Sequence, residues 1–284
     1  MIPTSFDYSR ATSLDDAIAR LAASGGGAKL LAGGHSLIPL MKLRLSEPMA
    51  LIDIARIPGL AGIKEKDGKI EIGAATTHHA VATAALLRDK CPALAETAET
   101  IGDPQVRNRG TIGGSLAHAD PAADYPAILL ALDAEIHIKS KGGWRVVKAA
   151  DFFQGLFTVD LQPEEIIAGV QVKPQKAAAY AKLHQRASHF AIVGVAASLD
   201  VAGGTVSAAR VALTGASTHA MRLANVEAAL AGKALSDDTI AAAAAVAGDG
   251  IDDINADIHA SADYRRAMIK VFTRRALEGA RARA

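Results

Sequence analysis

The sequence predicts an α+β protein with two domains. Its 284 residues suit two domains of ordinary length, and half of them are hydrophobic, enough to bury two cores. Two Gly-Gly pairs, at 33–34 and 113–114, each lie between a strand-like run and a helix-like run. The composition changes near Pro174-Gln175-Lys176, beyond which strand candidates precede helix candidates. We therefore expect an N-terminal domain over 1–175 and an α+β C-terminal domain over 176–284.

Strand and helix signals alternate over the first 72 residues. Ser13 is a typical N-cap, and the apolar residues that follow it recur at helical spacing. Gly25-Gly26-Gly27 ends this helix, and Asp67-Gly68 further on is typical of a hairpin turn. The other elements expected here are a strand over Lys29–Leu31, a short helix over Ser36–Leu45, and strands over Leu51–Ile54 and 70–72.

The middle of the chain is expected to be mostly helical. We predict a helix from Thr77 to about Thr100 with a break at Pro92, and another that starts at Asp120-Pro121. His78 and His79 are adjacent, so they point about 100° apart on a helix and suit a solvated face better than a metal site. A hairpin around Gly142-Gly143 and a strand over Ile166–Val172 complete this domain.

Three strands and then three helices are expected in the C-terminal domain. The strands are 178–183, 191–199 and 206–213, and the first two helices are 225–230 and 239–247. Ser261 starts a long basic helix whose expected apolar side is Tyr264, Met268, Val271, Phe272 and Leu277. The arginines of this helix, Arg265, Arg266, Arg274 and Arg275, are expected on a solvated or interface face.

Charge and cysteine usage exclude several classes of protein. A net charge of +1, from 31 basic and 30 acidic residues, does not indicate binding to nucleic acid or to an anionic membrane. Apolar runs such as Phe190–Leu199 are far shorter than the ~18 residues that span a bilayer. No signal peptide is recognisable, so a cytoplasmic location is expected. Cys91 is the only cysteine and cannot hold an iron–sulfur cluster, so any cluster or metal must belong to another chain.

The two glycine loops are the candidate binding elements. A Gly-Gly pair lets the backbone bend sharply and leaves its N–H groups uncovered, which makes a concave anion site. We interpret the two loops as converging on the pyrophosphate of one dinucleotide. Neither loop has the G-x-G-x-x-G spacing, and His35 stands where a P-loop needs Lys. The alternative is a pair of ordinary turns, as we expect for Gly25-Gly26-Gly27, Gly142-Gly143 and Gly203-Gly204.

The motifs around these loops resemble a known family. They are Ala32-Gly33-Gly34-His35-Ser36-Leu37, Asp103-Pro104-Gln105-Val106-Arg107-Asn108-Arg109-Gly110-Thr111-Ile112-Gly113-Gly114-Ser115 and Ala117-His118-Ala119-Asp120-Pro121-Ala122-Ala123-Asp124. Together with Asp257-Ile258-His259-Ala260-Ser261 near the C-terminus, they are similar to the medium, FAD-binding subunit of molybdenum hydroxylases. That family includes the medium chain of aerobic carbon monoxide dehydrogenase and the flavin part of xanthine dehydrogenase. The resemblance implies an FAD-binding fold of the vanillyl-alcohol-oxidase (PCMH) type, in which residues 1–175 form two α/β subdomains of about 1–57 and 58–175.

The resemblance also implies a set of FAD-binding residues. Non-covalently bound FAD is expected at Ala32, Gly33, Gly34, His35, Ser36, Leu37, Ile101, Thr111, Ile112, Gly113, Gly114, Ser115, Ala117, Asp124, Ile167 and Lys182. In this interpretation both Gly-Gly pairs expose backbone donors to the pyrophosphate, and Thr111 and Ser115 add hydroxyl groups. Asp124 is expected at the ribityl hydroxyls, because a carboxylate repels phosphate, with a helix N-terminal charge as the alternative.

Other residues of this region have more than one possible role. Ile101 and Ile167 are expected beside the isoalloxazine, or simply in the core. Lys182 is expected near the reactive edge of the ring, or on the surface. His35 lies in the pyrophosphate loop and is a poor candidate for covalent attachment of the flavin. Arg107 and Arg109 either neutralise phosphate or face a partner, and the sequence does not separate these roles.

The function implied is electron transfer within an assembly. A small partner subunit would carry two [2Fe–2S] clusters and a large one the molybdopterin cofactor, in a dimer of heterotrimers. Electrons would pass through FAD to an external acceptor, so no catalytic residue and no metal ligand is expected on this chain. The alternatives are a stand-alone FAD-dependent oxidoreductase of the same fold and a binding module without activity. The sequence predicts neither the substrate of the complex nor its electron acceptor.

Overall fold

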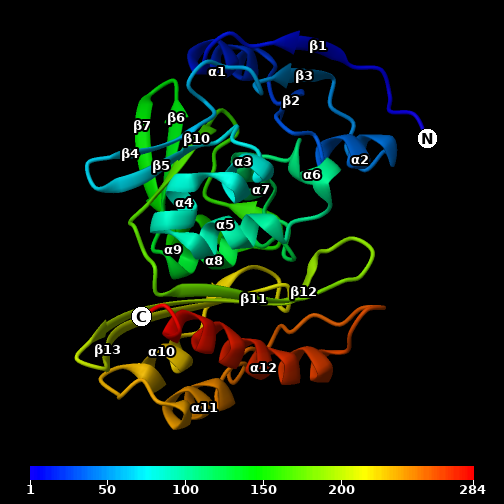
Figure 1. Cartoon of the computed structure of the whole chain (residues 1–284). Coiled ribbons are helices and arrows are strands. Elements are labelled where there is room, and N and C mark those ends of the chain that lie inside the picture. The colour runs from blue at the N-terminus through cyan, green and yellow to red at the C-terminus, as the bar shows by residue number, and fades with distance from the viewer.

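A computed structural model describes residues 1–284, and three main sheets follow one another from the N-terminal to the C-terminal end of the chain (Figure 1). The first sheet is parallel, in the order β1 (Asp7–Arg10), β3 (Ala50–Asp53), β2 (Ala28–Leu31). Its helices are α1 (Leu14–Ala23) and α2 (Leu37–Lys42). Ser13 caps α1 as predicted, accepting from the amide of Asp16 at 3.0 Å. The first glycine loop joins the carboxyl end of β2 to α2, so it lies at one edge of this sheet.

The second sheet is antiparallel and has five strands. Their order is β4 (Ile63–Lys66), β5 (Lys69–Gly73), β10 (Ile166–Val172), β6 (Glu135–Ser140), β7 (Gly143–Lys148). The turn between β4 and β5 is Asp67-Gly68, both with positive φ, as the hairpin prediction requires. The helices and short strands of this part are α3 (His78–Thr83), α4 (Ala85–Lys90), α5 (Pro92–Glu99), α6 (Pro104–Arg107), α7 (Ile112–His118), α8 (Tyr125–Ala131), α9 (Ala149–Phe152), β8 (Phe153–Gly155) and β9 (Thr158–Val159).

Two helix predictions in this part are corrected. The segment from Thr77 to Thr100 breaks at Ala84 as well as at Pro92, because Ala84 is extended, with ψ 118°. The helix expected at Asp120-Pro121 begins at Tyr125 instead. Ala119 is left-handed and ends α7, and an Asp120 carboxylate oxygen then accepts from the amide of Ala122 at 2.8 Å. This Asx turn takes up the residues that the helix was expected to use.

The third sheet separates two hydrophobic cores. It consists of β11 (Ala178–His184), β12 (Ala191–Ala202), β13 (Thr205–Thr214) and β14 (Met221–Arg222), with helices α10 (Ala224–Leu230), α11 (Asp237–Ala245) and α12 (Ala262–Arg281). Side chains alternate along each strand. Ala196 and Ala212 pack into the core that contains α5 and α8, whereas Val195 and Val211 pack into the core that contains α10 and α12. Figure 1 shows the sheet as a layer between these helices.

The basic helix α12 differs from its prediction on both faces. Ser261 caps it, as expected, but Tyr264 and Val271 are exposed while Arg265 is buried. The Arg265 guanidinium donates to the carbonyls of Ile192 and Gly215, at 2.6 and 2.9 Å, and pairs with Asp257. These partners replace water, so the expectation of a solvated arginine is wrong here. No helix in the structure is both long and apolar enough to cross a membrane.

Candidate functional site

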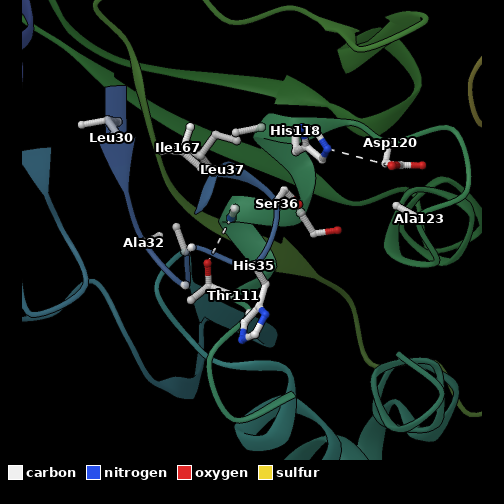
Figure 2. A pocket seen from close by; sticks show the side chains of 18 of the residues that line it. Leu30, Ala32, His35, Ser36, Leu37, Thr111, His118, Asp120, Ala123 and Ile167 are labelled. Carbon is white, nitrogen blue, oxygen red and sulfur yellow. Dashed lines mark hydrogen bonds and ion pairs between the residues drawn. The ribbon is translucent and has the colours of Figure 1, made fainter. Parts of the chain in front are cut away.

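A cavity of about 630 Å³ lies where the first glycine loop meets the second (Figure 2). This size is within the range typical of ligand sites. Leu37 comes from the start of α2, Thr111 and His118 from the two ends of α7, and Ile167 from β10. The predicted residues on its wall are Ala32, Gly33, Gly34, His35, Ser36, Leu37, Ile101, Thr111, Gly113, Gly114, Ser115, Ala117, Asp124 and Ile167. Two predicted residues, Ile112 and Lys182, lie behind the wall.

The first loop presents a row of unused backbone donors. None of the five amides from Gly33 to Leu37 donates a hydrogen bond within the protein. Gly34 has φ +78°, a conformation that favours glycine. Buried or half-buried amides are almost always paired in folded proteins, so such a row is a fitting cradle for an anion.

The second Gly-Gly pair was expected in a loop, but Gly113 and Gly114 lie in the first turn of α7, directly after the second loop, and they do not present such a row. The amide of Gly113 donates to the carbonyl of Ala74 at 2.9 Å, and that of Gly114 to the Thr111 hydroxyl at 3.2 Å. The expectation that both Gly-Gly pairs expose backbone donors is therefore wrong for this pair. The side-chain hydroxyls of Thr111, the N-cap of α7, and of Ser115 within α7 remain available to a ligand, and the Thr111 contact is drawn in Figure 2. Ile112 is fully buried and anchors the start of α7 in the core.

Glycine is required where the two loops touch. A Cβ on Gly33 would overlap the carbonyl oxygen of Arg109 and lie 2.7 Å from Cα of Gly110. Gly110 in turn packs against the His78 ring, with Nε2 2.5 Å from where a Cβ would stand. The first loop, the second loop and α3 are thus in direct backbone contact, which sets the shape of the cavity floor.

His78 was expected on a solvated face and is instead buried in the cavity wall. Its Nδ1 lies 3.3 Å from the Tyr125 hydroxyl, and its amide donates to the Gly110 carbonyl at 2.9 Å. Burial, with smaller contributions from His35 and Arg107, lowers the pKa of His78 to about 4. The ring is therefore neutral at pH 7, and it does not contribute a positive charge to the site.

Asp124 forms the polar wall in the part of the cavity nearest the third sheet. It is buried, directly precedes α8, and accepts from the Tyr180 hydroxyl at 2.5 Å and from Lys182 Nζ at 2.8 Å. Burial raises the pKa of Asp124, and the Lys182 ammonium opposes that rise. The Lys182 side chain is 4% exposed, so it is not a surface lysine.

Lys182 and Arg107 both hold the segment that carries Ile101. Lys182 Nζ donates to the carbonyl of Thr100 at 3.1 Å, and Arg107 donates to those of Ile101 and Gly102, at 3.0 and 2.8 Å. Neither Arg107 nor Arg109 lies on the cavity wall, so a phosphate contact is not supported for them. Arg107 instead fixes the turn at Gly102, and Ile101 and Ile167 supply apolar wall.

Several wall residues were missed from the sequence. Ser188, His189 and Phe190 reach the cavity from the loop between β11 and β12. His118 lies 3.9 Å from an Asp120 oxygen, the contact drawn in Figure 2. Only the packing of the third sheet against α8 brings the 188–190 loop to the site, and no local motif marks it. No group of three or more His, Cys, Asp or Glu is placed to hold a metal ion.

Comparison with known proteins agrees with this architecture. The family described as the FAD binding domain in molybdopterin dehydrogenase matches residues 4–175, and the CO dehydrogenase flavoprotein C-terminal domain matches residues 178–280. The carbon monoxide dehydrogenase medium chain of Hydrogenophaga pseudoflava is 40% identical over 286 residues, covering 100% of this chain and 99% of that protein. Subunit alpha of the 6-hydroxypseudooxynicotine dehydrogenase complex of Paenarthrobacter nicotinovorans is 42% identical over 290 residues, covering 100% and 97%. A solved structure of carbon monoxide dehydrogenase from H. pseudoflava superposes with a TM-score of 0.96, at 41% identity and full coverage of both chains.

Proposed function

The chain belongs to the FAD-binding medium subunits of the carbon monoxide dehydrogenase and xanthine dehydrogenase family of molybdenum hydroxylases, and from this premise we propose that it is the electron-transfer subunit of a heterotrimeric enzyme. In the proposed complex a small subunit carries [2Fe–2S] clusters and a large subunit carries the molybdopterin cofactor. Bound FAD would supply two-electron redox chemistry, taking electrons from the clusters and passing them to an external acceptor.

The observation that carries this proposal is the row of five free amides at Gly33 to Leu37. A hydrogen bond to a charged group contributes about 1.5–3 kcal/mol, so two or three such bonds to a pyrophosphate outweigh any single side chain nearby. The Thr111 and Ser115 hydroxyls face the same space, and Asp124, which would repel phosphate, lies elsewhere on the wall. This division suits a ligand with an anionic centre and a hydroxyl-bearing arm.

The need for partners follows from what the chain contains. Cys91 is buried and is the only cysteine, so the clusters belong to another polypeptide. We propose two copies of each of three subunits. The cytoplasmic location expected from the sequence stays a prediction.

Two measurements test the function. Acid precipitation of the purified chain should release a flavin with the mass of FAD, and a flavin that stays on the denatured protein or has the mass of FMN would contradict non-covalent FAD. Co-expression with a cluster-bearing and a molybdopterin-binding partner should give a complex that contains FAD, iron and molybdenum. Turnover of a small substrate by the chain alone, on the order of 1–1000 per second, would replace this function by that of a stand-alone oxidoreductase.

A further inference from the structure

Tyr180 makes a hydrogen bond to Asp124 that has no role in the function proposed above. It lies on β11, and its hydroxyl donates to Oδ1 of Asp124 at 2.5 Å. Lys182 is two residues further along the same strand and donates to Oδ2 at 2.8 Å. Because residues i and i+2 of a strand share a face, β11 delivers one donor to each oxygen of the same carboxylate. Two side chains of the third sheet thereby fix Asp124, a residue of the cavity wall.

The fold keeps a space open for the Tyr180 hydroxyl. On the neighbouring strand β12, a Cβ at Gly194 would overlap that hydroxyl oxygen and would lie 2.8 Å from Cγ2 of Thr214. Gly194 pairs with Lys182 in the ladder, and its φ is not positive, so backbone conformation does not require glycine there. Room for the Tyr180 hydroxyl and for Thr214 is the remaining reason for glycine at this position.

The two donors leave part of the carboxylate available. An ionised carboxylate has about four lone-pair sites, and Tyr180 and Lys182 occupy two of them. Asp124 lies on the cavity wall and is 4% exposed, so its remaining acceptor capacity faces the site and not bulk water. Burial alone would favour the neutral acid. A fixed carboxylate that accepts from a ligand hydroxyl therefore depends on both donors.

We propose that Tyr180 is a positioning residue for the cofactor, which holds the Asp124 carboxylate in the orientation that accepts hydrogen bonds from the hydroxyl-bearing arm of FAD. This inference rests on the proposed function, because it concerns the same cavity. Tyr180 acts through Asp124 and does not touch the cofactor in this assignment. Gly194 contributes by leaving room for the hydroxyl.

The test is FAD titration of the full-length apo-protein, unaltered and with Tyr180→Phe, Asp124→Asn and both changes. Tyr180→Phe should raise the Kd for FAD about tenfold, because the Asp124 carboxylate, left with one donor, is expected to lose one hydrogen bond to a cofactor hydroxyl. In the Asp124→Asn background the same change should add less than about twofold, because the partner is already altered. The visible circular dichroism of bound FAD at saturation should change with Tyr180→Phe. Tyr264→Phe, the same chemical change at an exposed position of α12, is the control and should match the unaltered chain.

Gly194→Ala gives a second route to the same contact, since it displaces the hydroxyl and keeps the tyrosine; it should weaken FAD binding in the same direction. A folded Tyr180→Phe variant that binds FAD like the unaltered chain would overturn the inference. An effect of equal size with and without Asp124→Asn would also overturn it. Failure of the unaltered chain to bind FAD would instead overturn the proposed function.

Discussion

Gly33→Ala is the sharpest perturbation of the site, because it adds one methyl group where the two glycine loops touch. The new Cβ would lie 2.7 Å from Cα of Gly110 and 2.8 Å from the carbonyl carbon of Arg109. Carbon atoms in contact are normally about 3.5–4.0 Å apart, so the loops must separate by about 1 Å. Gly110 cannot retreat, since it already packs against the His78 ring.

The magnitude follows from the amide row. An N–H···O bond near 2.9 Å that lengthens by about 1 Å is no longer a hydrogen bond. If two of the five free amides from Gly33 to Leu37 lose their contact with a pyrophosphate, the loss is about 3–6 kcal/mol, at about 1.5–3 kcal/mol each. That corresponds to a rise of about 10²- to 10⁴-fold in the Kd for FAD.

The matched control is Gly169→Ala on β10. A Cβ there would lie 2.8 Å from the carbonyl oxygen of Ile72, so it crowds a backbone in the same way, and Gly169 is not on the cavity wall. Calorimetric titration with FAD and thermal unfolding should show both variants destabilised but only Gly33→Ala impaired in binding. A folded Gly33→Ala variant that binds FAD within about threefold of the unaltered chain, or equal impairment by Gly169→Ala, would refute the reasoning.

Other expectations follow from the same contacts. Thr111→Val removes the cap of α7 and should lower the free energy of unfolding by about 0.5–2 kcal/mol, measured by urea unfolding, whereas Ser115→Ala, which breaks no intramolecular bond, should leave it unchanged. The pKa of His78 is about 4 in the folded chain against an ordinary 6.5, so the unfolded state binds more protons between these values. The neutral, buried His78 ring contributes about 3 kcal/mol to the free energy of unfolding. This contribution should be complete above pH 6.5 and lost as the pH falls toward 4, and His78→Gln should flatten that part of the stability profile measured by urea unfolding. Arg265→Ala should cost about 2–5 kcal/mol in the same assay because it removes the donor to the carbonyls of Ile192 and Gly215 and to Oδ2 of Asp257, and equal stability of Arg265→Ala and the exposed Arg274→Ala would contradict this.

Local sequence determined much of the framework. Ser13 and Ser261 cap the helices that they were expected to start, and Asp67-Gly68 makes the predicted hairpin. Three strands of the C-terminal sheet begin within a residue of their predicted positions, and the fourth, the two-residue β14, was not predicted. Helix caps, turns and the alternation of apolar and polar residues depend on residues a few positions apart, so they can be predicted from a single sequence. The motif around Gly33 also indicated the first loop at the cavity, whereas Gly113, expected in a second loop, lies in α7.

The tertiary structure decided which of these groups can act. Gly33 and Gly113 look alike in sequence, yet the amide of Gly113 is used by Ala74 while that of Gly33 is free. His78 and Arg265 have polar surroundings in sequence but are buried by distant elements. Asp124 meets Tyr180 only because the third sheet packs against α8. Hydrogen-bond partners and burial depend on contacts between segments far apart in the chain, and short-range sequence patterns do not predict those contacts.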